Sequence, residues 1–318
     1  MTKSAKSILL LGATGTIGRA TANALVAAGY TVVAPVRLGS DATDMGIAVP
    51  CELTQTDLFS IMTEHACDAV ISCVASRSGA PTEARAIDRD LNSAALSAAK
   101  SAGVQQYVLL SAICVQRPKL AFQQAKLAFE SELQAAPITW SIVRPTAFFK
   151  SLSGQADRLR AGKPFLLFGN GKLTACKPIS NNDLARYLVQ CLTDTALQNR
   201  ILPIGGPGPA ITPRAQGKML FQAFGKPPRF KHVPVGLMSA IVGGLSMLGK
   251  VSSRMRDKAE LARIGRYYAT ESMLVWDEAA GRYDADATPE FGTETLADHY
   301  KRLATEDIAD DRGAHAVF

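Results

Sequence analysis

The chain has 318 residues, of which 47% are hydrophobic and 20% charged, a balance typical of a globular protein with a sizeable core. The formal net charge is +7, but no basic run alternates with aromatic residues, which argues against a nucleic-acid partner. The six cysteines are scattered without a C-x-x-C pair, so we expect reduced thiols, no metal site and a cytoplasmic location. No apolar run reaches the ~18 residues of a membrane-spanning helix.

In the first half of the chain, strand candidates alternate with segments of helix length. The apolar run "SILLLGA" predicts a strand buried on both faces, and "IGRATANALVAAG" after it has helical spacing and ends at Gly29. Helices are also expected near residues 55–66, 83–102 and 119–135. The other strand candidates are "TVVAPV", "GIAVPCEL", "DAVISCVAS", "QYVLLSA" and "TWSIVRP". This alternation predicts an α/β fold with a Rossmann-type, doubly wound parallel sheet.

Beyond about residue 150, Pro and Gly become frequent, which predicts a smaller C-terminal substrate cap. We expect an NADP-binding Rossmann domain over residues 1–147 and a substrate-binding cap over 148–304. Residues of about 174–204 are expected to return to the Rossmann sheet, and 305–318 to form a loose acidic tail. The apolar residues 235–250 favour a buried cap helix. A wall of the substrate pocket and a helix on a membrane surface are the alternatives.

The motif "GATGTIG" follows the first strand candidate and opens the first helix. Gly12 permits the tight turn, Gly15 lets backbone N–H groups approach a pyrophosphate, and Gly18 lets helix and strand pack closely. We therefore expect a dinucleotide site. Its expected residues here are Gly12, Thr14, Gly15, Thr16, Ile17, Gly18 and Arg19.

The second strand candidate indicates which dinucleotide is bound. An NAD site usually has an acidic residue at the end of this strand, but "VVAPVR" ends in Arg37 and has none. A guanidinium there suits a 2′-phosphate, and Arg19, in the first turn of the first helix, is a second candidate. The sequence therefore predicts NADPH as cofactor.

A short-chain dehydrogenase pattern lies between Ser111 and Lys126. Ser111 ends an apolar strand, and Lys126 lies on the next helix, but the tyrosine of the usual Tyr-x-x-x-Lys motif is replaced by Phe122. We expect Lys126 to clamp the nicotinamide ribose and assign it as the catalytic residue. A solvated lysine on that helix is the alternative.

Several blocks together resemble the divinyl chlorophyllide a 8-vinyl reductases, which are atypical short-chain dehydrogenases related to isoflavone-reductase-like proteins. The resemblance extends from about Ile8 to Leu303 and includes "LLSAICVQRPKLAFQQAKLAFESEL", "WSIVRPTAFFKSLSGQ" and "IGRYYATESMLV". It implies NADPH-dependent reduction of the 8-vinyl group of divinyl chlorophyllide a, or divinyl protochlorophyllide, to ethyl. A plant member would carry a plastid transit peptide. We see none in this sequence, so the resemblance suggests a photosynthetic bacterium.

The missing tyrosine agrees with this chemistry. Ordinary members use Tyr to protonate a carbonyl oxygen, whereas a vinyl group has no oxygen. Hydride added to the vinyl terminus would leave charge delocalised over the tetrapyrrole, so Phe122 is free to pack against the ring. Cys114, Tyr267, Tyr268 and water are the candidate proton donors.

Further site residues follow from position, because ligands of open α/β sheets lie beyond the carboxyl ends of the strands. We expect Phe122, Phe149, Tyr267 and Tyr268 to bind substrate, with core packing an equal alternative for Phe148 and Phe149. Basic residues near 226–232 and 250–258 are candidate partners of the substrate propionate. Cofactor contacts are expected at Ala75, Ser76, Arg77, Ser111, Lys126, Pro145, Thr146 and Phe148.

Two other functions compete with the reductase. One is a non-catalytic NADP(H)-sensing regulatory protein of this fold, and the other is a reductase of another conjugated alkene or a quinone. Peripheral contact with a photosynthetic membrane and the oligomeric state are left open.

Overall fold

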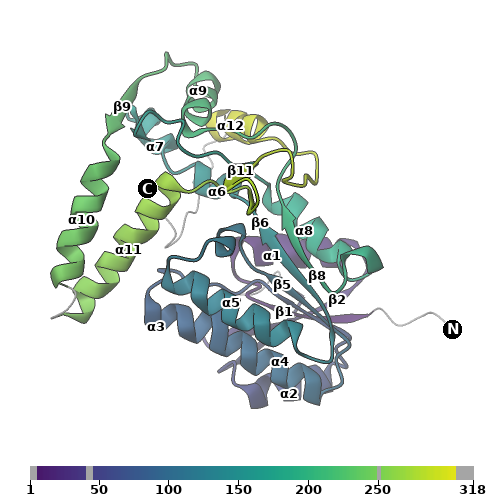
Figure 1. Cartoon of the computed structure of the whole chain (residues 1–318). Coiled ribbons are helices and arrows are strands. Elements are labelled where there is room, and N and C mark those ends of the chain that lie inside the picture. Colours follow the sequence, from purple (N-terminus) through teal and green to yellow (C-terminus); the bar gives the residue numbers. More distant parts are fainter. Residues whose placement is uncertain (1–5, 41–45, 249–251, 306–318) are drawn as a thin grey trace.

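The structure, a computed structural model, describes residues 6–40, 46–248 and 252–305 and is built on one large parallel sheet (Figure 1). Its seven strands lie in the order β3-β2-β1-β4-β5-β6-β8. They are β1 (Ser7–Leu11), β2 (Thr31–Arg37), β3 (Ile47–Cys51), β4 (Ala69–Ser72), β5 (Gln106–Leu110), β6 (Thr139–Pro145) and β8 (Arg200–Ile204). The strand order reverses between β1 and β4, so the Rossmann-type doubly wound fold is confirmed.

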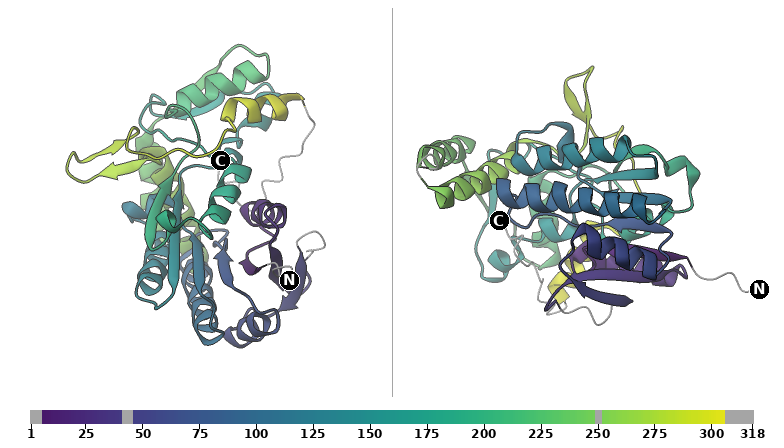
Figure 2. Two further views of the ribbon diagram at one scale, coloured as in Figure 1. Left: turned by 90° about the vertical axis from the view of Figure 1, so that its right-hand side faces the viewer. Right: turned by 90° about the horizontal axis from the view of Figure 1, so that it is seen from below.

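Helices cover both faces of the sheet (Figure 2). Helices α1 (Thr16–Ala27) and α8 (Asn181–Gln190) pack on one face, and α2 (Gln55–Glu64), α4 (Asn92–Ser101) and α5 (Ala121–Gln134) pack on the other. Along β1, Ile8 and Leu10 face the first layer, while Leu9 and Leu11 face the second. After Ser7 the strand is apolar at every position because both of its faces are buried.

The helix expected over residues 83–102 is one helical run with an irregular beginning. It starts as α3 (Pro81–Ala84), widens into the π-helix η1 (Arg85–Leu91) and continues as α4. A π-turn leaves carbonyls without their usual α-helical donors. The side-chain Nδ2 of Asn92 donates to two of them, Ile87 O at 3.3 Å and Asp88 O at 3.1 Å. Asn92 therefore stabilises the wide turn that carries Asp88.

Most of the second half forms a cap with its own core. Its elements are α6 (Phe149–Leu152), α7 (Ala156–Arg160), β7 (Phe165–Phe168), α9 (Pro213–Ala223), β9 (Phe230–Val233) and α12 (Leu296–Thr305). Phe165, Phe221 and Tyr300 are fully buried in that core. Between β7 and α9 the chain returns to the sheet through α8, the short 3₁₀ helix η3 (Thr195–Leu197) and β8.

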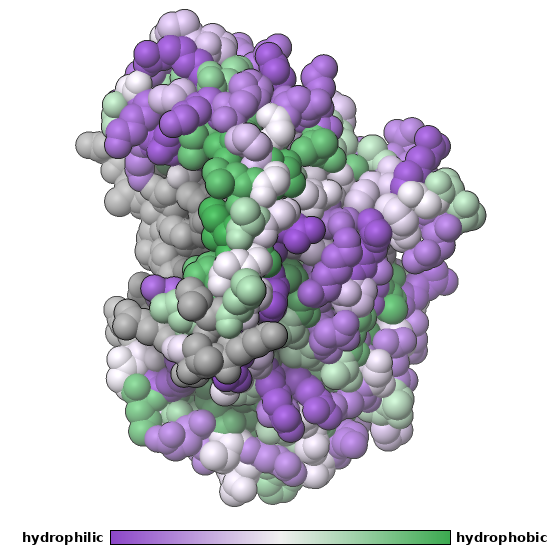
Figure 3. Space-filling model, turned by 60° about the vertical axis from the view of Figure 1, so that its left-hand side comes forward, coloured by the Kyte–Doolittle hydropathy of each residue, from purple (hydrophilic) through white to green (hydrophobic). Residues whose placement is uncertain are grey.

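Helices α10 (Val235–Leu248) and α11 (Ser253–Thr270) form a hairpin that projects beside the body (Figures 1 and 2). Helix α10 is not the buried helix favoured by its composition, because Leu237 is 52% exposed, Ile241 49% and Met247 73%. Figure 3 shows a hydrophobic strip on this side of the molecule. The expected helix runs beyond the described residues at 249–250, and the expected tail lies outside them from 306 onward.

The inner end of α11 packs on the loop between β5 and α5. This loop contains the 3₁₀ helix η2 (Ile113–Gln116), and α11 leads on to the small hairpin of β10 (Val275–Asp277) and β11 (Arg282–Asp284). Ile113, Cys114, Ile264, Tyr267 and Met273 share one apolar cluster there. The helical hairpin of α10 and α11 therefore has one end fixed against the carboxyl edge of the sheet.

Candidate functional site

The glycine turn between β1 and α1 has a backbone that larger residues would disrupt. Gly12 has φ +75°, and a Cβ on it would lie 2.9 Å from the carbonyl carbon of Cys73. A Cβ on Gly18 would lie 2.0 Å from Gly12 O. Gly15 caps α1, whose first turn contains no acidic residue, so its free N–H groups can receive an anion. This cradle fits a dinucleotide pyrophosphate.

Side chains around this turn differ in what they can contribute. Thr14 is exposed, and its carbonyl accepts a hydrogen bond from Arg19 Nε at 3.3 Å. Ile17 is 8% exposed and packs in the core, so it can offer a ligand only its backbone. Lys150 of α6 donates from Nζ to Thr16 Oγ1 at 2.8 Å. The cap thus brings a cation to the amino end of α1.

Arg37 and the segment after β4 follow the two strands that flank β1, namely β2 and β4. Arg37 ends β2 and is exposed. Ala75 and Arg77 are also exposed, while the backbone N–H of Ser76 lies 3.3 Å from Asp88 Oδ1. Because the carboxyl ends of parallel strands meet at one edge, these residues border the glycine turn along the switch point.

Lys126 is buried and is not a solvated helix residue. Its Nζ lies 2.9 Å from Asp88 Oδ1, and the side chains of Lys126 and Asp88 are 10% and 0% exposed. Lys126 is on α5 and Asp88 on the π-turn, so the pair joins two helices at the carboxyl edge of the sheet. Burying a charged pair requires each partner to be compensated. The ammonium and the Ser76 N–H supply that compensation to Asp88.

Ser111 lies next to this edge, but its hydroxyl is engaged elsewhere. Its Oγ donates to Glu130, one helical turn beyond Lys126 on α5, and Glu130 also pairs with Arg144 of β6. All three lie between the sheet and α5, with Ser111 5% and Glu130 1% exposed. The expectation of a cofactor contact through this hydroxyl is not supported, because the hydroxyl is committed to a buried network.

The residues after β6 divide between the site and the core. Pro145 ends the strand, and Thr146 donates its hydroxyl to Lys177 O. Phe148 is half-buried against the sheet core. Phe149 is 3% exposed within the cap core, its ring 5.4 Å from that of His299. Core packing is therefore the better interpretation of Phe149, and its expected substrate contact is not supported.

Phe122 lies on α5 one helical turn before Lys126, at the inner end of the hairpin. A Cβ built on Gly79 would lie 2.8 Å from Ile264 Cδ1 and 3.4 Å from Phe122 Cδ1. Phe122 thus packs between the loop after β4 and α11, and it is only partly buried. The site where a tyrosine acid would act carries an apolar ring instead.

The two adjacent tyrosines of α11 have different surroundings. Tyr267 is 4% exposed and donates its hydroxyl to Cys114 O at 2.9 Å and Arg117 O at 3.2 Å, so it holds the loop before α5. Tyr268 is 39% exposed, and its phenol interacts electrostatically with the nearby Cys114 thiol. Burial raises the pKa of Tyr268 well above its ordinary value and also raises the pKa of Cys114. Tyr267 is therefore a structural residue, and Tyr268 is the tyrosine with ring surface available to a ligand.

A second residue of α11 fixes the beginning of α5. Glu260 is 4% exposed, and its Oε1 accepts a hydrogen bond from the backbone N–H of Ala121 at 2.9 Å. Ala121 is the first residue of α5, so the carboxylate satisfies one of the free N–H groups at the helix start. The hairpin thereby contacts the helix that carries Phe122 and Lys126.

Within the described residues, no group of three or more His, Cys, Asp or Glu side chains is placed to hold a metal ion. The same part of the chain contains no helix that is both long and apolar enough to cross a membrane.

Comparison with known proteins agrees with this geometry. A family model described as NAD(P)H-binding matches residues 12–195. The chloroplastic divinyl chlorophyllide a 8-vinyl-reductases of Cucumis sativus and Oryza sativa subsp. indica are each 42% identical to this chain over 98% of it, covering 80% and 82% of their own lengths. The NADPH-dependent quinone oxidoreductase of Escherichia coli, solved with NADPH, has the same fold with a TM-score of 0.68 at 17% identity, over 93% of this chain and 99% of that one. The chain belongs to the divinyl chlorophyllide a 8-vinyl-reductase family.

Proposed function

We propose that this chain reduces the 8-vinyl group of a divinyl chlorophyllide to ethyl with NADPH. The observation that carries the proposal is the pair Phe122 and Lys126, because a buried, ion-paired lysine is retained while the phenolic acid is absent. The name of the relatives identifies the pigment as divinyl chlorophyllide a. The two features together fit a hydride acceptor that needs a positioned cofactor and no oxyanion acid.

The cofactor cradle is proposed from the residues that border it. Gly12, Gly15 and Gly18 would admit the pyrophosphate, Lys150 adds a cation at the helix terminus, and Arg37, exposed at the end of β2, would bind the ribose phosphate. Lys126 would orient the nicotinamide ribose, with Asp88 holding the ammonium in place. Bound NADPH would supply the hydride to the vinyl terminus.

The remaining chemistry concerns one proton and the electrons left in the macrocycle. Hydride addition to the terminal vinyl carbon leaves an electron pair that the conjugated tetrapyrrole delocalises, and a proton then completes the ethyl group. Tyr267 is committed to two backbone carbonyls, which leaves Tyr268, Cys114 and water as the candidate donors. NADP⁺ and the ethyl pigment are the products, so the reaction balances without a metal.

The test is turnover of defined pigments in the dark. Divinyl chlorophyllide a and divinyl protochlorophyllide are each incubated with the protein and NADPH, while absorbance and NADPH oxidation are followed together. We expect a blue shift as the vinyl leaves conjugation, with one NADPH consumed per ethyl product. NADPH binding without turnover of either pigment would favour the non-catalytic sensor, and turnover of a simple quinone alone would favour the other reductase.

The location of the protein is proposed with the function. The plant relatives are named chloroplastic, and we propose that this chain works in the cytoplasm, with peripheral contact to a photosynthetic membrane left as a secondary proposal. Fractionation of cells at low and high salt, followed by detection of this chain, distinguishes a free protein from one held at a membrane by charge.

A further inference from the structure

The hairpin contains a groove on one side of the junction between α10 and α11. Its volume is about 360 Å³, which is within the size range of ligand sites. The residues used below come from both helices: Met238, Ile241 and Leu245 from α10, and Lys258, Leu261 and Gly265 from α11. The groove is apolar apart from one ammonium group.

This groove continues toward the site at the edge of the sheet. Lys258, Leu261, Gly265 and Tyr268 are spaced by three, four and three residues, so they share one stripe of α11. Tyr268 ends the stripe with its ring partly exposed, next to Tyr267, which packs with Cys114 and Phe122 at the edge of the sheet. From Lys258 to Tyr268 the helix rises about 15 Å. The stripe therefore connects an outer cation with the proposed reaction site.

The shape and charge of the groove fit a flat, apolar ligand with one distant carboxylate. Gly265 has no side chain, so it leaves space for a flat ring in the middle of the stripe. Leu261, Ile241 and Met238 provide apolar surface around it. Lys258 is exposed and forms no ion pair with any residue in the described ranges. In a chlorophyllide, the propionate is on the pyrrole ring diagonal to the one that carries the 8-vinyl group. A pigment with its vinyl group near Lys126 would thus direct its carboxylate outward.

We propose that the groove between α10 and α11 binds the tetrapyrrole macrocycle and that Lys258 pairs with its propionate. The inference rests on the proposed function and adds to it the position and orientation of the substrate. It explains why α10 is apolar yet exposed, since its surface would be covered when pigment is bound. It also identifies Lys258 as the residue of the basic segment 250–258 that would pair with the propionate.

The first experiment compares the free acid of divinyl chlorophyllide a with its methyl ester, which lacks the negative charge. We expect Lys258→Ala to raise KM for the acid roughly threefold to tenfold, as for a partly exposed ion pair, and to leave the ester unchanged. Lys258→Glu is expected to raise it further, and Lys258→Arg to stay near wild type. Lys218→Ala, at an exposed lysine of α9 outside the groove, is the matched control. An unchanged KM for the acid in Lys258→Ala and Lys258→Glu would overturn the proposal.

A second variant tests the apolar part of the groove. Leu261 is 43% exposed, so Leu261→Glu should be tolerated by the fold, and unchanged NADPH affinity verifies this. We expect a higher KM for acid and ester alike. If KM is unchanged, while the variant no longer binds anionic lipid vesicles or elutes as a smaller species than wild type, the groove is a membrane or subunit surface and the proposal is wrong. Wild-type protein that reduces neither pigment refutes the proposed function itself, which separates that failure from failure of the groove.

Discussion

Lys126 and Asp88 form a buried ion pair, with Nζ 2.9 Å from Oδ1, at the carboxyl edge of the sheet. The pair ties α5 to the π-turn and keeps the lysine beside the loop after β4, where a nicotinamide ribose would lie in this fold. It also means that the lysine cannot be removed without leaving a buried carboxylate alone.

The first prediction uses this coupling. Lys126→Met should lower the free energy of unfolding by about 3–5 kcal/mol, because Asp88 is left charged and unpaired in the interior. The double variant Lys126→Met with Asp88→Asn should recover most of that loss but neither NADPH affinity nor the rate of hydride transfer. Chemical denaturation and single-turnover kinetics measure the two effects separately. Wild-type cofactor affinity and rate in the double variant would show that the pair is only structural.

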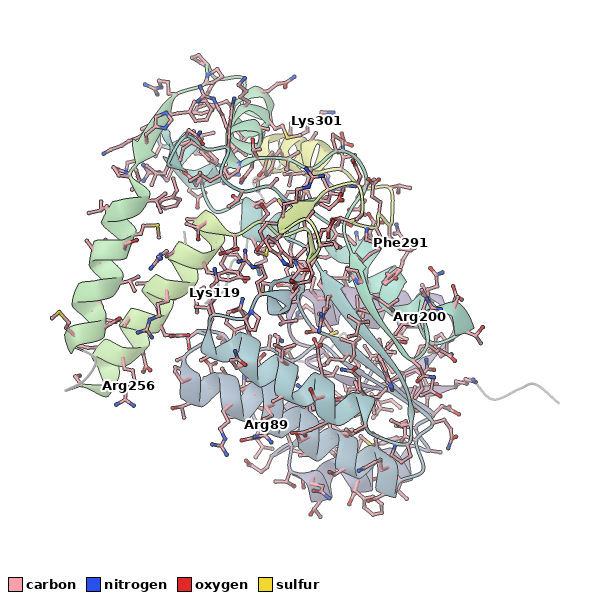
Figure 4. The ribbon with its side chains drawn as sticks, viewed as in Figure 1. Arg89, Lys119, Arg200, Arg256, Phe291 and Lys301 are labelled. Carbon is pink, nitrogen blue, oxygen red and sulfur yellow. The ribbon has the colours of Figure 1, made fainter. Side chains whose placement is uncertain are left out.

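A second prediction concerns the choice between NADPH and NADH. Arg37→Ala should weaken NADPH binding up to about tenfold and leave NADH nearly unchanged, since a charge-assisted contact on the 2′-phosphate would be lost. Arg200→Ala is the control, because Arg200 is an exposed arginine that begins β8 at the opposite edge of the sheet (Figure 4). Equal weakening of both dinucleotides would assign Arg37 a structural role.

Lys150 gives a third prediction with the opposite pattern. Its Nζ contacts Thr16 at the start of α1, close to where the pyrophosphate shared by NADPH and NADH would lie. Lys150→Met should therefore weaken both dinucleotides by a similar factor, roughly three- to tenfold. Titration of each cofactor by fluorescence measures this. A loss confined to NADPH would place Lys150 at the 2′-phosphate instead.

The fourth prediction tests the meaning of Phe122. Restoring the phenol with Phe122→Tyr should not accelerate vinyl reduction, because the proposed reaction forms no oxyanion for the phenol to protonate. Single-turnover NADPH oxidation across pH should show no new titration in the variant. A gain of tenfold or more, with a new pH dependence, would show that the reaction uses a phenolic acid at this position.

His299 supplies a prediction about stability in acid. Its Nε2 lies 2.9 Å from Ser153 Oγ inside the cap, and burial, followed by the nearby charge of Arg302, lowers the pKa of His299 below its ordinary value. The unfolded chain therefore binds this proton more readily, so the cap should lose stability as pH falls below about 6.5. His299→Gln should flatten the dependence of the melting temperature on pH between about 7.5 and 5, whereas the exposed His232→Gln should not. Parallel curves for His299→Gln and wild type would contradict this account.

The fold and the glycine turn could be predicted from sequence because each depends on local patterns. Strand β1 is apolar from Ile8 to Leu11 since both faces are buried, and Gly12 and Gly18 are required by contacts that no Cβ can accommodate. Lys126 and Phe122 could be identified by their spacing along one helix.

The contacts that complete the site join residues that are distant in the chain. Lys150 and Thr16 are 134 positions apart. Asp88, the partner of Lys126, lies in a π-turn that the Asn92 side chain stabilises and that the composition of this helical segment does not indicate. Tyr267 and Tyr268 looked equivalent until the face by which α11 docks was known. Sequence periodicity identifies the helices but does not identify the partner to which each face turns.

The hydrogen bond between Glu260 of α11 and the first N–H of α5 links two equilibria: the docking of α11, and the ordering of the start of the helix that carries Lys126. Any ligand that steadies α11 in its docked position also favours the ordered start of α5, and any ligand held by α5 favours docking of α11 by the same factor. Pigment and dinucleotide should therefore bind with positive cooperativity beyond that supplied by their direct contact. Glu260→Gln, which keeps the shape and removes the charge, would reduce that cooperativity before it affected either binding site.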